Sequence, residues 1–323
     1  MRAKILELLR SKHGNCVSGA EIASQLGVSR TAVWKHINEL KSAGYQIESK
    51  ARSGYCLLEC PDKLLPELIK HNLATKLLGQ TVVSYEDIPS TNDEAKKLAA
   101  HGADEGTVVV SESQSTGKGR LERSFFCPAG GLWFSVILRP DFLPQEAPKC
   151  TLMAAVAVAK AMRDMGLDAG IKWPNDIYCQ ERKLTGILTE MSAEMDRINY
   201  LVVGIGINAN IPLESFPEDV KNKAGSMSAI LGHNIDRVFF LQKILTYMED
   251  IYIDVLKNGF ERALDQWREY SITLGQLIDV FGVQEKFAGV AEDIDADGAL
   301  LVRTDTGLRR VLAGDVSIRP RQQ

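Results

Sequence analysis

Residues 111–139 combine cations, glycines and aromatic rings in a way that suits a nucleotide or another anionic ligand. Three cations within six residues would attract a phosphate, and the glycines beside them let the backbone approach it closely. Aromatic rings nearby offer flat surfaces to a base. A solvated basic surface loop is the alternative, and composition alone does not separate the two. The residues are Lys118, Arg120 and Arg123, with Gly117, Gly119, Gly130 and Gly131, and the rings of Phe125, Phe126 and Trp133.

This stretch resembles the biotin-binding loop and strand of biotin–protein ligases. The matching residues are Gln114, the run Gly117-Lys118-Gly119-Arg120, Arg123 and the following GGLWFSVILRP. The usual pattern is Gly-Arg-Gly-Arg followed by a Gly, an Arg and a Trp. The chain departs from it at Lys118, which replaces an Arg, at Glu122, where Gly is common, and at Phe125, where Trp is common.

A second run, residues 171–191, gathers polar groups at a sharp turn, because Pro174 disfavours helix in the residue before it. Without its neighbours, Lys183 would be interpreted as an ordinary lysine in a hairpin. The order Lys-Trp-Pro-Asn-Asp, then Arg-Lys, then Gly-Ile-Leu-x-Glu resembles the second signature of the same ligases. That resemblance implies that Lys183 is the ligand-contacting lysine of the family.

Two further segments carry the resemblance. Ser90-Thr91-Asn92 opens a predicted helix through Ala100, and the simple interpretation of Thr91 with Glu94 is a capping box. In biotin–protein ligases a Ser-Thr-Asn at this place contacts the biotin ureido ring. Asn208 ends a strand-like run, and the family places this Asn near the ATP phosphates or metal.

The resemblance implies an ATP-dependent biotin–protein ligase that is also a biotin-responsive repressor. Biotin and ATP, with magnesium, would give biotinyl-5′-adenylate, and the biotin would pass to a lysine of a biotin carboxyl carrier protein. The expected biotin-binding residues are Ser90, Thr91, Asn92, Gln114, Gly117, Lys118, Gly119, Arg120, Lys183 and Gly186. The expected ATP-binding residues are Arg120, Arg123, Phe125, Trp133, Lys172, Asn175 and Asn208. The expected catalytic residues are Arg120, Lys183 and Asp176, the last to orient or deprotonate the carrier amine.

Two other functions fit parts of the pattern. A biotin-sensing repressor without ligase activity is compatible with Glu122 and Phe125, where the loop departs from the family. A lipoate ligase is compatible with the central fold, but the Lys-Trp-Pro-Asn-Asp run argues against it.

Residues 1–62 show three short helical patterns and then a strand hairpin. Ser18-x-x-Glu21 is a capping box, Gly27 suits a tight turn, and Ser29 opens a longer helix. This order is typical of a winged helix-turn-helix. A small helical interaction module that binds no DNA is the alternative. The apolar face of the longer helix is Val33, Ile37 and Leu40. Trp34 can be interpreted as a DNA contact or as a core residue, and is assigned to the core. The expected DNA-binding residues are Arg30, Thr31, Lys35, His36 and Arg52.

The fold class expected for the whole chain is α+β, in three domains. Residues 1–62 form the winged helix-turn-helix domain. Residues 63–272 form a central mixed β-sheet with helices, as in biotin and lipoate ligases, and include a helix over Leu64–Leu78. Residues 273–323 form a small Src-homology-3-like β-barrel, predicted from short strands separated by Gly turns.

The charge distribution and the cysteines limit which partners and which compartment are expected. The 323 residues carry a net charge of −4, but residues 1–60 hold nine Lys/Arg against five Asp/Glu, which leaves −8 on the rest. This asymmetry predicts that only the N-terminal part meets nucleic acid. The resemblance implies that the nucleic acid is operator DNA, bound by a homodimer on a palindromic site. Six cysteines without a C-x-x-C pair predict free thiols in the cytoplasm. No apolar run is long enough for a membrane span, and no secretory signal is recognised.

Overall fold

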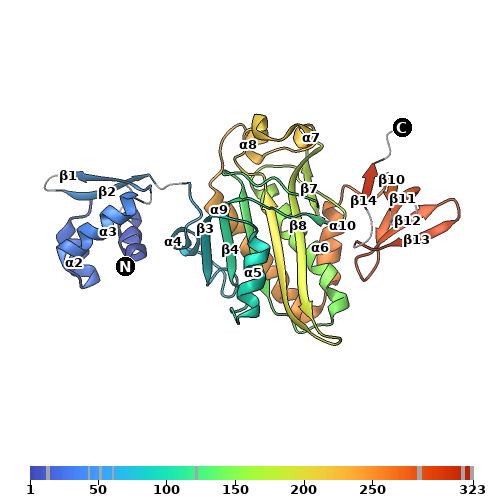
Figure 1. The fold of residues 1–323 in the computed structure, drawn as a ribbon, viewed down its shortest axis with the longest axis horizontal. Coiled ribbons are helices and arrows are strands. Elements are labelled where there is room, and N and C mark those ends of the chain that lie inside the picture. Colours follow the sequence, from blue (N-terminus) through green and yellow to red (C-terminus); the bar gives the residue numbers. More distant parts are fainter. Residues whose placement is uncertain are drawn as a thin grey trace. The chain divides into compact units, whose positions relative to one another are not determined.

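The computed structural model describes residues 1–11, 15–42, 44–50, 53–59, 62–120, 123–281, 286–313 and 317–320. The chain divides into two compact units, Met1–Asn72 and Leu73–Gln323 (Figure 1).

The first unit is a winged helix-turn-helix, as predicted. The hydroxyl of Ser18 accepts a hydrogen bond from the Glu21 backbone N–H at 3.0 Å, and Gly27 ends the helix at a φ of 65°. Ser29 caps the next helix by accepting from the Ala32 N–H at 3.1 Å. The elements are α1 (Arg2–Ser11), α2 (Gly19–Leu26), α3 (Arg30–Ser42), the antiparallel strands β1 (Gln46–Lys50) and β2 (Gly54–Glu59), and α4 (Pro66–Lys70).

The inner face of α3 is filled by Val33, Ile37 and Leu40, each fully buried. Trp34, predicted to be core, is 58% exposed. The prediction was wrong because Val33, one residue earlier, takes the inward position, and a helix turns by about 100° per residue.

Two cysteines of this unit form a disulfide, contrary to the prediction of free thiols. Val17 and Tyr55 exchange both backbone hydrogen bonds at 2.9 Å, which sets Cys16 opposite Cys56 with 4.2 Å between their Cα atoms. The spacing is that of a directly opposite pair in an antiparallel ladder. Cys127, Cys150 and Cys179 are buried free thiols, and Cys60 lies outside the described residues.

A seven-stranded sheet forms the centre of the second unit, in the order β3-β4-β5-β9-β8-β7-β6. β3 and β4 pair in parallel, and the other neighbours are antiparallel. The strands are β3 (Val82–Ile88), β4 (Val108–Gln114), β5 (Leu132–Leu138), β6 (Gly170–Lys172), β7 (Asp176–Cys179), β8 (Arg182–Ala193) and β9 (Ile198–Ile207).

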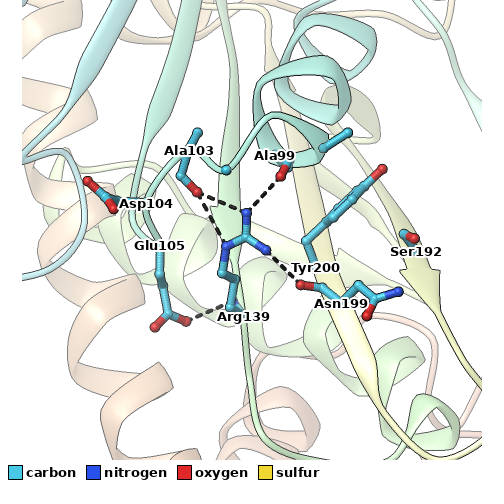
Figure 2. A pocket seen from close by; sticks show the side chains of 10 residues that line it. Ala99, Ala103, Asp104, Glu105, Arg139, Ser192, Asn199 and Tyr200 are labelled. Carbon is cyan, nitrogen blue, oxygen red and sulfur yellow. Dashed lines mark hydrogen bonds between the residues drawn. The ribbon is translucent and has the colours of Figure 1, made fainter.

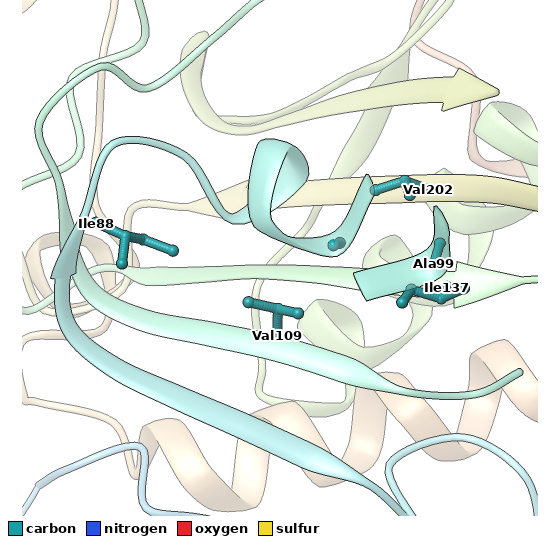
Figure 3. Packing of buried hydrophobic residues seen from close by; sticks show 6 residues of the cluster. Ile88, Ala99, Val109, Ile137 and Val202 are labelled. Atoms are coloured by element: carbon teal, nitrogen blue, oxygen red, sulfur yellow. The ribbon is translucent and has the colours of Figure 1, made fainter. Parts of the chain in front are cut away.

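Helices cover both faces of this sheet (Figure 1). On one face, Ala95 and Ala99 of α5 (Thr91–Ala100) pack on Val109, Ile137 and Val202 from three adjacent strands (Figure 3). The other face carries α6 (Ala147–Asp164), α9 (Arg237–Asn258) and α10 (Glu261–Tyr270). Two short helices, α7 (Glu218–Lys221) and α8 (Met227–Leu231), and the 3-10 turns Pro144–Glu146 and Leu213–Ser215 complete the set.

The helix predicted over Leu64–Leu78 is present only as α4, Pro66–Lys70. Beyond α4, a carboxylate from a distant part of the chain accepts hydrogen bonds from the backbone N–H groups. Glu249 of α9, 6% exposed, accepts from the N–H groups of Lys76, Leu77 and Leu78 at 2.6, 2.7 and 2.7 Å. These donors are therefore satisfied outside a helix.

The C-terminal strands form an antiparallel sheet in the order β13-β12-β11-β10-β14. It contacts the central sheet at the turn before β7, where the indole N–H of Trp173 donates to the carbonyl of Gly298 at 3.1 Å. Lys149 of α6 donates to the carbonyl of Ala296 at 3.1 Å. The strands are β10 (Leu277–Phe281), β11 (Lys286–Ile294), β12 (Leu300–Thr304), β13 (Gly307–Val311) and β14 (Ser317–Pro320).

Among the described residues, no helix has both the length and the apolar character that a membrane crossing requires.

We expect Glu249→Ala to lower the free energy of unfolding by about 3 kcal/mol, because each buried donor left unsatisfied costs roughly 1–3 kcal/mol. Denaturant unfolding followed by circular dichroism measures this loss. Asp250→Ala, at the next, exposed position of the same helix, is the control and should change little. Equal losses in the two variants would contradict the role assigned to Glu249.

Candidate functional site

The start of α5 holds the predicted Ser-Thr-Asn tripeptide in a buried polar cluster. Ser90 is the N-cap and accepts from the Asp93 N–H at 3.4 Å, so the cap lies one residue before the predicted Thr91. Ser90, Thr91 and Asn92 are each 4% exposed. The Thr91 N–H donates to the side-chain oxygen of Gln114 at 2.6 Å. The structure therefore brings together all four residues predicted for one end of the ligand.

The amide of Asn92 is satisfied by three groups on two strands, β5 and β8. Its oxygen accepts from the Ser135 hydroxyl at 2.6 Å, and its nitrogen donates to the Glu190 carboxylate at 2.8 Å and to the Leu188 carbonyl at 3.2 Å. Gly204 leaves the necessary space, because a Cβ there would lie 1.9 Å from the Asn92 oxygen. Sequence reasoning assigned neither Ser135 nor Glu190 to the site, although Glu190 ends the Gly-Ile-Leu-x-Glu run; Ser135 lies in an apolar strand without a polar pattern.

The basic loop folds as a hairpin beside this cluster. The Phe125 N–H donates to the Gly117 carbonyl at 2.8 Å, and the Gly119 N–H donates to the Arg123 carbonyl at 2.7 Å. At Gly117 a Cβ would come within 2.4 Å of the Phe125 carbonyl oxygen, so the close approach requires glycine. Leu121 and the divergent Glu122 lie outside the described residues.

Lys118, the lysine that replaces the usual arginine, is held by α5. Its ammonium lies 2.7 and 2.9 Å from the two oxygens of Asp93. Asp93 also pairs with Lys96 at 3.1 Å, and Lys96 pairs with Glu190 at 2.6 Å. Burial alone would raise the pKa of Asp93, but the hydrogen bonds from Lys118 and Lys96 outweigh it and lower the pKa. One signal in the sequence could have indicated Asp93, namely its position directly after the tripeptide.

Arg120 reaches the opposite side of the site. Its guanidinium donates to the Asn175 side-chain oxygen at 3.2 Å, and Asn175 donates to the Ile187 carbonyl at 2.9 Å. Burial lowers the pKa of Arg120, and the charge of Asp176 partly offsets this. The Lys183 ammonium lies 2.7 Å from an Asp176 oxygen, close enough for an ion pair but not along a hydrogen-bond direction.

An aromatic residue covers this second group of charges. The ring of Phe125 lies on Gly186 and Gly206, where Cβ atoms would be 2.9 and 3.1 Å from it. The Lys183 ammonium sits 5.6 Å from the same ring's centre. Trp133 meets Phe125 edge-on, is fully buried and donates its N–H to the Pro128 carbonyl. Trp133 is thus packed behind Phe125, and its predicted place in the ATP site stays a prediction.

The remaining predicted residues, Asn208, Lys172 and Arg123, have different surroundings. Asn208 is 4% exposed and donates to the Lys183 carbonyl at 3.3 Å, while its side-chain oxygen has no partner among the described residues. Lys172 lies over the Tyr178 ring at 5.1 Å. Arg123 is exposed, and its carbonyl holds the loop hairpin.

Cys127 is a hydrogen-bond partner of the Gln114 side chain. The Gln114 amide donates to its sulfur at 3.1 Å, and the thiol donates to the Phe125 carbonyl at 3.4 Å. Burial raises the pKa of Cys127 to about 12, although the hydrogen bond from Gln114 works against this. The residue is therefore a thiol at neutral pH and orients Gln114 rather than acting as a nucleophile.

Two hollows of the second unit differ in their relation to this site. One of about 210 Å³ is walled by Arg120, Asn175 and Glu190, and includes Gly298 and Ala313 of the C-terminal sheet region. A larger one of about 660 Å³ surrounds Arg139 and contains none of the predicted residues (Figure 2).

Arg139 has a structural role in the larger hollow. Its guanidinium donates to the carbonyls of Ala99, Ala103 and Asn199 at 2.8 to 3.3 Å (Figure 2). These contacts satisfy carbonyl groups at and beyond the C-terminal end of α5. We therefore place the site at the smaller hollow and the basic loop.

In the first unit, the predicted DNA-binding residues Arg30, Thr31 and Lys35 are all exposed on α3. His36 is half-buried, with its ring nitrogen 2.9 Å from the Glu39 carboxylate, so it is engaged with its own helix. Arg52 lies outside the described residues.

The fold and the site define a protein of the biotin and lipoate ligase class. Residues 85–208 match the Biotin/lipoate A/B protein ligase family, residues 2–56 an HTH domain, and residues 273–319 the Biotin protein ligase C terminal domain. The biotin protein ligase from Aquifex aeolicus, solved in complex with biotin and ATP, has a TM-score of 0.66 and 28% identity. The match covers 75% of this chain and 100% of that one.

The chain belongs to the family of bifunctional biotin ligase/repressors. It is 39% identical over 320 residues to the bifunctional ligase/repressor BirA of Bacillus subtilis, a match that covers 98% of each. Identity to the Escherichia coli protein of the same description is 28% over 326 residues, covering 98% of this chain and 96% of that protein.

We expect Asp93→Asn to loosen the basic loop, because a half-exposed ion pair contributes roughly 0.2–1 kcal/mol. Limited trypsin digestion should then cleave after Lys118 up to about five times faster, as followed by mass spectrometry. Glu94→Gln is the control, since Glu94 lies next on the helix and pairs with Lys97 instead. Unchanged cleavage in Asp93→Asn would show that the pair does not hold the loop.

Proposed function

We propose that the chain activates biotin with ATP to biotinyl-5′-adenylate and transfers the biotin to a lysine of a biotin carboxyl carrier protein. We propose also that it represses transcription as a biotin-responsive dimer on operator DNA. One observation carries the ligase proposal. The buried cluster of Ser90, Thr91, Asn92 and Gln114 lies beside a loop whose cations reach both sides of the site.

The first step joins two anions, because the biotin carboxylate attacks the α-phosphorus of ATP while pyrophosphate leaves. The polar cluster suits the biotin head, which offers both donors and acceptors. Lys118, Arg120 and Lys183 would face the carboxylate and phosphates and stabilise the negative charge of the transition state. Since Asp93 and Asp176 hold two of these cations in the structure, the cations are already oriented.

Magnesium is part of this proposal, and the residues fit it. The described residues contain no group of three or more His, Cys, Asp or Glu that would hold a metal alone. Mg²⁺, however, is commonly bound by one or two protein oxygens together with substrate phosphates. The partnerless oxygen of Asn208 and the carboxylate of Asp176, both beside Lys183, are such donors. When bound, the ion would neutralise phosphate charge.

In the second step, a carrier lysine attacks the acyl carbon and AMP leaves. The amine must be neutral, although its ordinary pKa is about 10.4. Asp176 is the residue proposed to orient or deprotonate it, and its carboxylate lies 2.7 Å from the Lys183 ammonium, beside the expected reaction centre. The hairpin loop closed by Gly117 and Phe125 would shield the adenylate from water in the meantime.

We expect the purified chain with biotin, ATP, magnesium and an apo carrier domain to add one biotinyl group to the carrier, as seen by intact mass. Lys183→Ala and Arg120→Ala should slow this by about 10²–10³-fold, the range for losing one transition-state charge contact. Lys257→Ala and Arg262→Ala, at exposed positions, are matched controls that should keep full activity.

The same assay separates the alternatives. Biotin binding without transfer or pyrophosphate release would leave a biotin-sensing repressor. Transfer of lipoate in preference to biotin would indicate a lipoate ligase. Full activity in Lys183→Ala would contradict the site assignment.

The regulatory proposal is that the adenylate orders the loop and favours a dimer, which presents two α3 helices to a palindromic operator. We expect sedimentation velocity to show dimerisation at least about ten times tighter with biotin, ATP and magnesium than without them. Lys183→Ala, which should form the adenylate about 10²–10³-fold more slowly, is the control and should not respond when the ligands are added immediately before the run. A dimerisation constant that is the same with and without the ligands would contradict this link.

A further inference from the structure

The structure contains one exposed tryptophan among four. Trp133, Trp173 and Trp267 are 0%, 2% and 0% exposed, whereas Trp34 is 58% exposed. A large indole left in water is unusual enough to require an explanation, because tryptophan is highly buried on average. An exposed tryptophan of this kind is a common anchor in binding surfaces.

The position of Trp34 indicates what covers it. It lies on the outer face of α3, the second helix of the helix-turn-helix, four residues after Arg30 and next to Lys35, both exposed. Residues four apart are neighbours on a helix surface, so Arg30 lies beside the indole. Lys35 follows Trp34 directly and lies about 100° further around the same exposed side. Residues 1–60 carry a net charge of +4. A polyanion complements this surface, whereas a second copy of the same cationic face would repel it.

We propose that Trp34 recognises a thymine in the major groove of the operator. This rests on the repressor part of the proposed function. An indole has one N–H donor, no acceptor and a broad apolar body. In the major groove only thymine presents an acceptor, O4, beside an apolar group, the C5-methyl. Cytosine presents a donor there and no methyl, so it offers the indole neither contact. Arg30 and Lys35 hold the flanking phosphates.

The test begins by selecting duplexes from a random-sequence pool with the full chain in the presence of biotin, ATP and magnesium. Each thymine of the selected site is then replaced by deoxyuridine, which removes only the methyl group. At one thymine per half-site, we expect the affinity of the native chain to fall about five- to tenfold, the lower end of what one base pair contributes. Trp34→Ala should bind both duplexes equally, at the weaker level. Trp34→Phe should keep part of the methyl dependence.

A second readout uses fluorescence. Acrylamide should quench the one exposed indole of the native chain, and the selected duplex should protect it. The control is Leu58→Ala, which removes another exposed apolar side chain of the same unit, 61% exposed on β2. This variant should retain both the methyl dependence and the protection. Carrier biotinylation should be unchanged in all the variants.

Each remaining outcome overturns the inference in a recognisable way. Native affinity and native uracil sensitivity in Trp34→Ala would show that the indole contacts no base. Loss of affinity for all duplexes without a thymine effect would make it a structural or phosphate-facing residue. Loss of dimerisation or of carrier transfer in Trp34→Ala would make the face a protein interface. If no duplex is enriched at all, the repressor proposal fails, and the Trp34 assignment fails with it.

Discussion

The buried amide of Asn92 imposes the constraint on which the rest of the site depends. An amide at 4% exposure must have its donor and acceptor satisfied, since an unpaired one costs roughly 1–3 kcal/mol. Ser135, Glu190 and the Leu188 carbonyl satisfy it from two strands, and Gly204 leaves the room. The start of α5 is therefore fixed against the sheet before any ligand arrives.

That constraint extends to the basic loop through a chain of charges. Glu190, which accepts from Asn92, also pairs with Lys96, and Lys96 pairs with Asp93. Asp93 in turn holds Lys118. A loop rich in glycine loses much freedom when it closes, so a preformed tether reduces that cost. The substitution of lysine for the family's arginine fits this arrangement, because a compact ammonium can meet a carboxylate in several orientations.

Sequence reasoning found the parts of the site that carry a local pattern and missed those that depend on distant contacts. The tripeptide, Gln114 and the loop were predicted from their motifs, and the structure brings them together. The helix predicted over Leu64–Leu78 was wrong in its second half because Glu249, more than 170 residues away, accepts hydrogen bonds from the backbone N–H groups there. Periodicity correctly placed Val33, Ile37 and Leu40 on the inner face of α3, but the assignment of Trp34 to the core was wrong, because apolar character alone does not show which way a side chain faces. The Cys16–Cys56 pair depends on strand register, which cysteine spacing does not reveal.

The distribution of charge explains how one chain can carry both a nucleotide site and a DNA site, each of which favours its own ligand. A free cationic loop on the larger unit would attract any polyanion. In the structure, however, Asp93 neutralises Lys118 and Asp176 neutralises Lys183, on a part of the chain whose net charge is −8 beyond residue 60. A ligand must therefore offer enough specific contacts to compete with those carboxylates. On α3, by contrast, Arg30 and Lys35 are exposed on a segment of net charge +4, which favours a long polyanion over a small ligand.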